Sequence, residues 1–238
     1  MSSLKLHISW KNWQLPYPER EIVTSWSRVH PELEKRLYTD DDNKDLLIAY
    51  FPWFLATYND YPYDIQKADA MRYFYLYLYG GIYSDADYEI FKRIPQSIFK
   101  SNCLVARKED SVTNFLMFGN GGRGFWGYVI SKLTEAHRIC MYDINKKIKN
   151  VFLSTGPTFL SSCYRNYQGS SKPTILDARD FDPYSRHSYA IAPKTLRSMM
   201  VGRSSVENTL KQVDLPEELL ERLHSCYGIH WRCSRWLR

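Results

Sequence analysis

A long apolar segment in the first half of the chain limits the folds that it can adopt. Residues 63–79 are predicted to form a helix with apolar side chains on nearly every side. Such a helix is stable only when neighbouring elements cover it all round. It ends at Gly80-Gly81, where a glycine can adopt the positive φ that terminates a helix. We therefore expect a central, buried helix inside a layered domain.

Short strands and helices alternate along the rest of the chain. Hydrophobic periodicity predicts strands at 5–9, 37–39, 82–83, 103–106, 115–118 and 174–176. Helices are predicted at 18–29, 126–136, 158–164 and 216–223, with another after Asp40-Asp41-Asp42, which offer its N-cap. This alternation predicts an α/β fold, in which helices flank a mixed, mostly parallel sheet. With 238 residues, the chain is expected to form a single domain, residues 1–238.

Asp69 and Arg72 place two charges inside the apolar helix. Their spacing of i and i+3 puts them on the same face. A buried charge is costly unless it is paired or bound to a polar ligand. Two interpretations stay open: an ion pair that only holds the helix, or a pair that grips a polar ligand such as sugar hydroxyls.

Asp85 and Asp87 follow the short strand that comes after the glycines. Carboxylate oxygens are preferred ligands of Mg²⁺ and Mn²⁺, together with phosphate oxygens of a substrate. At strand spacing, residues i and i+2 point the same way, so both carboxylates can face one ion. A D-x-D pattern alone is weak evidence because it recurs by chance. Its position after a buried, charged helix strengthens the prediction of a divalent-cation site.

Composition excludes several classes of function. The net charge is +6, but no zinc-finger, helix-turn-helix or RNA-recognition pattern accompanies it, so no nucleic-acid partner is expected. The five cysteines form no C-x-x-C pair, which argues against a zinc site and fits a reducing compartment. No signal sequence or transmembrane segment is recognisable, so we expect a soluble, cytoplasmic protein unless a membrane anchor has been removed. The sequence does not indicate an oligomeric state.

Two polar segments are interpreted as loops. Lys146, Lys147 and Lys149 form a basic cluster that is typical of a solvated loop. Gly119–Gly124 is rich in glycine but lacks the Lys-Ser/Thr of a P-loop. We interpret it as a mobile loop on the acceptor side of a site, the side where a second substrate would bind.

The central block resembles the signature of a known family. Residues 68–73 read A-D-x-x-R-Y, residues 76–83 read L-Y-x-x-G-G-I-Y, and Asp85-Ala86-Asp87 supplies the D-x-D. This order is similar to that of the D-x-D sugar transferases. They include fungal initiating α-1,6-mannosyltransferases, inositol-phosphoceramide mannosyltransferases, bacterial capsule enzymes and, more distantly, glucosylating clostridial toxins. The three segments in this spacing are far more specific than the D-x-D alone.

Weaker resemblances extend along most of the chain. They comprise Leu6–Trp10, similar to an opening I-H-x-x-W, then Trp26, His30–Glu32, Leu37–Asp40, Asn114, Thr155–Pro157, His230 and Ser234-Arg235-Trp236. The terminal Ser and Trp are adjacent in relatives, whereas Arg235 separates them here. The third metal contact therefore stays open between His230 and Ser234.

The resemblance implies a GT-A fold, Rossmann-like in half of its sheet, and a retaining glycosyltransferase. The implied donor is a UDP- or GDP-hexose, the cofactor is Mn²⁺ or Mg²⁺, and the acceptor is a hydroxyl of a glycan, lipid or protein. The implied catalytic residues are Asp85, Asp87 and Asn114, the implied metal ligands are Asp87, Asp85 and His230, and the implied donor-binding residues are Trp10, Asp69, Arg72, Tyr83, Ser234 and Trp236. Trp10 would stack on the base, an interpretation that is balanced evenly against packing in a core, whereas for Tyr83, an aromatic residue of a strand, packing in a core is favoured.

Two other functions remain open. A non-catalytic nucleotide-sugar or carbohydrate-binding protein would use the same residues. A metal-dependent phosphohydrolase would also hold its ion through carboxylates. Phosphatases with an Asp nucleophile, however, carry their D-x-D after an early strand, whereas here it follows a long buried helix.

Overall fold

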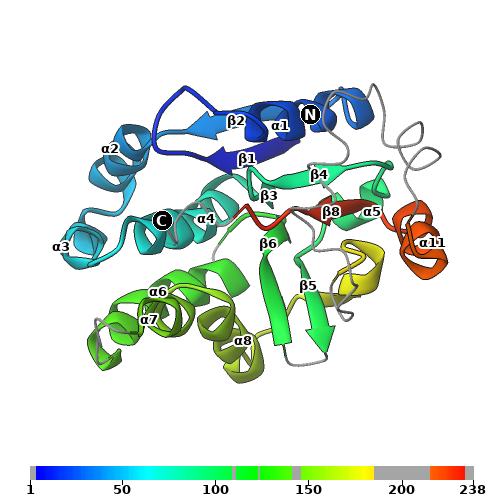
Figure 1. The fold of residues 1–238 in the computed structure, drawn as a ribbon. Coiled ribbons are helices and arrows are strands. Elements are labelled where there is room, and N and C mark those ends of the chain that lie inside the picture. The colour runs from blue at the N-terminus through cyan, green and yellow to red at the C-terminus, as the bar shows by residue number, and fades with distance from the viewer. Residues whose placement is uncertain (1–3, 109–110, 123, 141–145, 185–214, 234–238) are drawn as a thin grey trace.

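A mixed sheet organises the computed structural model, which describes residues 4–108, 111–122, 124–140, 146–184 and 215–233. The order of its six strands is β2-β1-β3-β6-β5-β7. Figure 1 labels all of these strands except β7. They are β1 (Lys5–Ser9), β2 (Glu34–Tyr38), β3 (Gly81–Ser84), β5 (Cys103–Lys108), β6 (Ser111–Gly119) and β7 (Thr174–Asp177). β1 pairs in parallel with β2 and β3, and β5 with β7, whereas β6 runs antiparallel to β3 and β5. The predicted mixed, mostly parallel sheet is confirmed.

Helices cover both faces of this sheet, as the predicted α/β fold requires. Neighbouring strand residues alternate between two cores, so that Tyr83 packs in one and Ile82 in the other. The helices of the first core are α2 (Asp40–Tyr50), α3 (Leu55–Asp60), α4 (Asp64–Tyr79), α6 (Phe125–Ile139) and α8 (Pro157–Asn166). Those of the second core are α1 (Glu19–Val29) and α5 (Gln96–Phe99). The other elements are η1 (Pro52–Phe54), β4 (Tyr88–Ile90), α7 (Lys147–Ser154), η3 (Ala178–Asp180), α11 (Glu217–Ser225) and β8 (Gly228–His230).

The buried helix is α4, and it ends where the sequence predicts. Its residues from Asp69 to Leu76 are all buried. Gly80 has a φ of 63° and Gly81 a φ of 85°, conformations that L side chains rarely adopt. A Cβ on Gly81 would lie 2.3 Å from the carbonyl oxygen of Lys5 in β1. Both glycines are therefore needed to turn the chain from α4 directly into β3.

His7 in β1 secures this turn. Its Nε2 lies 2.8 Å from the carbonyl oxygen of Gly80 and its Nδ1 lies 3.2 Å from the hydroxyl oxygen of Tyr38. Because a carbonyl can only accept, Nε2 carries the proton and Nδ1 accepts from Tyr38. Burial lowers the pKa of His7 to about 4. The imidazole is therefore neutral in the folded protein at physiological pH.

Acidification is expected to destabilise the protein through His7. The unfolded chain binds a proton near pH 6.5, whereas the folded protein resists protonation until pH about 4. Stability is therefore fully present above pH 6.5 and is lost as the pH falls through this window, by on the order of 3 kcal/mol. Urea unfolding of wild type and His7→Gln between pH 7 and about pH 4 measures this loss. If the free energy of unfolding depends on pH equally in wild type and in His7→Gln, the assignment of this loss to His7 is contradicted.

The α2 cap and the glycine-rich loop differ in detail from the prediction. Thr39, rather than an aspartate, is the N-cap of α2, and it forms a capping box with Asp42. The segment Gly119–Gly124, interpreted as a mobile acceptor-side loop, packs against the end of α4. The N–H of Gly122 donates to the carbonyl of Tyr77 at 2.8 Å. In its described part the loop supports the helix terminus, because carbonyls at a helix end need donors.

The sequence patterns do not predict every element of the fold, and α7, β4 and β8 are three that they miss. The cluster of Lys146, Lys147 and Lys149, interpreted as a solvated loop, belongs to the start of α7. The short strands β4 and β8 form a separate antiparallel sheet in which Tyr88 pairs with His230.

Among the described residues, no helix has both the length and the apolar character that crossing a bilayer requires. The single domain spanning 1–238 stays a prediction.

Candidate functional site

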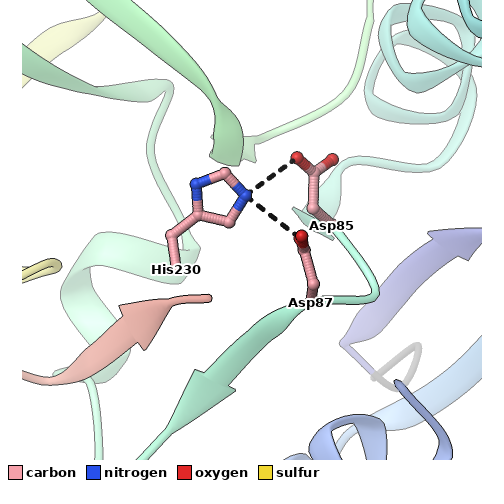
Figure 2. A group of neighbouring side chains, drawn as sticks. All are labelled: Asp85, Asp87 and His230. Atoms are coloured by element: carbon pink, nitrogen blue, oxygen red, sulfur yellow. Dashed lines mark hydrogen bonds and ion pairs between the residues drawn. The ribbon is translucent and has the colours of Figure 1, made fainter. Parts of the chain in front are cut away.

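Asp85 and Asp87 lie in the turn that connects β3 to β4, at the carboxyl end of β3. The N–H of Asp85 donates to the carbonyl of Phe115 at 2.8 Å, and the N–H of Tyr88 donates to the carbonyl of Asp85 at 3.1 Å. The aspartates are thus held by a turn rather than by strand spacing. Both carboxylates nevertheless face the same side chain, that of His230 (Figure 2).

The small β4–β8 sheet carries His230 to the aspartates. Its Nε2 lies 3.0 Å from Oδ1 of Asp87 and 3.7 Å from Oδ2 of Asp85. One ligand atom from each of the three residues lies within 4.8 Å of the others. The imidazole stacks on Phe115 with 4.8 Å between ring centroids. A residue 143 positions away in sequence is therefore fixed beside the D-x-D.

The backbone after β8 also forms hydrogen bonds with Asp87. The N–H of Trp231 donates to its carbonyl at 2.9 Å, and the N–H of Cys233 donates to its Oδ2 at 2.8 Å. Burial opposes ionisation of Asp87, but the charge and hydrogen bond of His230 and the N–H of Cys233 hold its pKa below the ordinary value. Asp87 is therefore a carboxylate that is ionised and oriented.

Arg72 connects the helix to the D-x-D. Its guanidinium forms an ion pair with Asp69 and lies 3.4 Å from Oδ1 of Asp85, and it donates to the carbonyl of Asn114 at 2.7 Å. It also lies over the ring of Tyr83, 4.6 Å from the centroid. The hydroxyl of Tyr83 donates to Asp85 at 2.9 Å. Five residues predicted from the sequence are thus brought together.

Negative charge exceeds positive charge in this cluster. Three carboxylates lie beside one guanidinium and one imidazole: Asp69 and Asp85 contact Arg72, whereas Asp87 contacts His230. Burial raises the pKa of Asp69 to about 7, against the attraction of Arg72. Burial also raises the pKa of Asp85, and the charge of Asp87 adds to this shift. A bound cation would relieve this excess, and two carboxylates with one imidazole form a donor set that fits a divalent metal ion.

The remaining predicted residues have different outcomes. Trp10 follows the carboxyl end of β1, next to β3, where its half-buried ring packs on the second core. Its indole N–H is buried and has no hydrogen-bond partner among the described residues. Ser234 and Trp236 lie outside the described residues. The roles assigned to all the site residues remain predictions.

Asp182 and Arg232 form a support for the site that the sequence did not reveal. Asp182 is fully buried, and its carboxylate pairs with Arg232 and lies 3.5 Å from the N–H of His230. Arg232 has a φ of 52°, a conformation that costs energy for a residue with a side chain. The pair therefore holds β8 where it presents His230. No motif marks it, because the two residues are 50 positions apart.

Arg232→Gln is expected to weaken this support. The buried carboxylate of Asp182 would lose its charged partner, which should lower the free energy of unfolding by about 2 kcal/mol. Mn²⁺ affinity should fall about 10-fold, because supports of metal ligands have effects of this size. Urea unfolding and Mn²⁺ titration followed by electron paramagnetic resonance measure both quantities. Arg179→Gln, which removes the exposed ion pair with Asp177, is the control and should change neither. Equal losses in both variants would contradict the assignment.

Comparisons with known proteins identify the segment that carries the site. Residues 16–105 match the family model described as the glycosyltransferase sugar-binding region containing DXD motif. The chain is 31% identical to inositol phosphoceramide mannosyltransferase 3 of Schizosaccharomyces pombe over 156 residues, 66% of this chain and 43% of that protein. It is 27% identical to mannosyl phosphorylinositol ceramide synthase SUR1 of Saccharomyces cerevisiae over 187 residues, 78% of this chain and 48% of that protein.

A solved structure, PaToxG Glycosyltransferase, superposes with a TM-score of 0.48 and 15% identity over 67% of this chain and 66% of that chain. The chain spans about half the length of the curated relatives that it matches. The matched residues 16–105 contain α4, the two glycines and both aspartates. The resemblance inferred from the sequence is therefore confirmed: residues 16–105 match the glycosyltransferase sugar-binding region containing the DXD motif, and the chain is similar to the fungal mannosyltransferases named above.

Proposed function

We propose that this protein is a metal-dependent, retaining glycosyltransferase that moves a hexose from a nucleoside diphosphate sugar to a hydroxyl acceptor. The observation that carries the proposal is the convergence of Asp85, Asp87 and His230 beside the Arg72–Asp69 pair. The two pairs Asp69–Arg72 and Asp85–Asp87 lie on the segment that matches the family model. The curated relatives are mannosyltransferases of inositol phosphoceramide, so mannose is the first sugar to test and a lipid-linked hydroxyl the first acceptor.

The predicted site residues would contact different parts of the donor. Asp85, Asp87 and His230 would hold Mn²⁺ or Mg²⁺, whose positive charge offsets the charge that builds on the departing nucleoside diphosphate. Arg72 is held by Asp69 and supplies a second, fixed positive charge next to the same position. Trp10, at the carboxyl end of β1, would contact the base, since ligands of open α/β sheets bind at the carboxyl ends of strands.

The anomeric configuration can be retained in two ways. The acceptor attacks on the face from which the leaving group departs, or a nucleophile of the enzyme first forms a covalent intermediate with the sugar. No residue of the sequence stands out as a nucleophile, so we infer that the acceptor attacks on the leaving group's own face. The protein then contributes orientation and electrostatic stabilisation, the terms that fixed polar groups supply. Asn114, whose backbone carbonyl is tied to Arg72, would lie near the reacting carbon.

Donor hydrolysis and transfer test this function. GDP-mannose, UDP-glucose and UDP-galactose are incubated with the protein and Mn²⁺, with and without an inositol phosphoceramide acceptor, and release of nucleoside diphosphate is followed. We expect turnover of one donor, stimulation by the acceptor, and loss with a chelator. Nuclear magnetic resonance of the product should show an α-linkage from an α-linked donor. Binding of a donor without turnover would instead indicate a carbohydrate-binding protein, and release of inorganic phosphate a phosphohydrolase.

A further inference from the structure

The outer face of α7 exposes apolar and basic side chains together. Ile148, Phe152 and Leu153 are 49%, 39% and 42% exposed. Ile148 and Phe152 are spaced i and i+4, which places them next to each other along the helix. With Lys147 and Lys149 they line an open hollow of ≈ 720 Å³ on the protein surface; Lys147 is half-buried, and its ammonium lies 5.5 Å from the centroid of the Tyr63 ring. We call the set of these five residues the α7 surface.

The opposite face of α7 is already packed. Val151 and Ser154 are buried, and the Oγ of Ser154 accepts a hydrogen bond of 2.6 Å from the amide of Gln66 in α4. The helix is therefore seated on the domain, and its exposed apolar residues are not part of an unfinished core. Figure 1 places α7 at the periphery of the molecule beside α6. Another surface can cover the α7 surface without any change in the fold.

Charge identifies the kind of surface that would cover it. α7 reads KIKNVFLS and contains no acidic residue, and Lys146 directly precedes it. Lysines around an apolar stripe are the pattern of helices that lie in the headgroup region of a bilayer, because the apolar side chains enter the lipid while the ammonium groups contact anionic headgroups. Two other exposed apolar residues belong to a helix with more acidic than basic side chains: Ile48 and Tyr50 lie on α2, whose first turn carries three aspartates.

We propose that the α7 surface docks the protein onto an anionic lipid membrane. The occupant is a bilayer that contains anionic phospholipid, with the side chains of Ile148, Phe152 and Leu153 inserted between headgroups. This inference goes beyond sugar transfer, since it concerns where the protein binds rather than what it catalyses.

The same helix is joined to the candidate site. Immediately after α7, the carbonyl of Thr155 accepts a hydrogen bond of 2.6 Å from the hydroxyl of Tyr73 in α4. The side chain of Thr155 also acts on Asp69, the partner of Arg72, because it lowers the pKa of that carboxyl. A bilayer bound to α7 would therefore be connected through two residues to the wall of the site, with no long flexible segment between them.

Flotation with vesicles tests the docking. Wild type is mixed with vesicles of phosphatidylcholine alone or with added phosphatidylserine, and the bound fraction is measured. We expect binding to the anionic vesicles, little binding to the neutral ones, and weakening by salt. Phe152→Ser/Leu153→Ser should lower the partition coefficient at least ~10-fold. Lys147→Gln/Lys149→Gln should lower it about 30-fold, whereas Lys147→Arg/Lys149→Arg should retain it.

The controls separate this surface from general stickiness and from catalysis. Ile48→Ser/Tyr50→Ser removes two exposed apolar side chains from acidic α2 and should leave vesicle binding unchanged. Hydrolysis of a water-soluble donor should be the same in wild type and in the α7 variants, because none of the substituted residues lies in the candidate site. Equal binding of wild type and both α7 variants to anionic vesicles would overturn the proposal. So would sedimentation showing that the α7 surface is buried between two copies of the chain while vesicles are not bound.

Discussion

Asp87→Asn is expected to abolish most of the sugar transfer while leaving the fold intact. Asp87 offers its carboxylate to the candidate metal position and accepts the N–H of Cys233. An asparagine oxygen can still accept that hydrogen bond, but the side chain loses the negative charge that holds a divalent ion. We expect kcat/KM to fall about 10³-fold, equivalent to ~4 kcal/mol of transition-state stabilisation. The rate is measured with saturating Mn²⁺ and the preferred donor, and the fold by circular dichroism.

The control for Asp87 is Asp64→Asn, which removes a carboxylate that is 92% exposed at the start of α4. It should change neither rate nor fold. A variant Asp87→Asn that keeps wild-type kcat/KM would show that the carboxylate does not take part in the reaction. A variant that unfolds would leave Asp85→Asn to answer the same question, since Asp85 receives no hydrogen bond from the chain after β8 in the described structure.

Arg72→Met is expected to have the largest effect on stability. It removes the only permanent positive charge that the described structure places against the buried carboxylate of Asp69. Breaking a buried ion pair in this way leaves an uncompensated charge and typically costs 3–5 kcal/mol, so we expect a loss of about 4 kcal/mol. Urea unfolding measures the loss. Lys67→Met breaks an exposed pair with Asp64 at the same i, i+3 spacing on the same helix and should cost no more than about 0.5 kcal/mol.

A double variant separates the structural role of this pair from its functional role. Asp69→Leu/Arg72→Met removes both charges, and it should be more stable than Arg72→Met because Asp69 no longer lacks a partner. Both variants should be inactive if the pair contacts the donor. A double variant with restored stability and wild-type kcat/KM would show that the pair only holds the helix.

The centre of the site could be predicted because its sequence signal is local. A helix that is apolar all round, two glycines and a D-x-D stand within residues 63–87, and short-range spacing fixes how they connect. Gly80 and Gly81 have positive φ, as a helix end that turns straight into a strand requires. The structure adds that Arg72 contacts both Asp69 and Asp85, which spacing along one helix does not reveal.

The supports of the site could not be predicted because they depend on long-range pairing. β4 and β8 have three residues each, too few for a period to be recognised, and their pairing joins residues more than a hundred positions apart. His230 was found by resemblance alone. The pair of Asp182 and Arg232 has no motif, and the lysines at the start of α7 predict a solvated loop where the structure forms a helix. Tertiary contacts, rather than local preference, decide these elements.

Nucleotide binding with and without metal tests the central claim, that Asp85, Asp87 and His230 form a divalent-cation site for a nucleoside diphosphate. Isothermal titration of GDP and of UDP is carried out in Mn²⁺ and in EDTA, on wild type and on Asp87→Asn, with thermal shift as a second readout because a ligand of the native state raises the melting temperature. We predict binding of one nucleotide in Mn²⁺, at least ~10-fold weaker binding in EDTA, and no effect of Mn²⁺ in Asp87→Asn. Binding of equal strength in Mn²⁺ and EDTA, or an undiminished Mn²⁺ effect in Asp87→Asn, would contradict it.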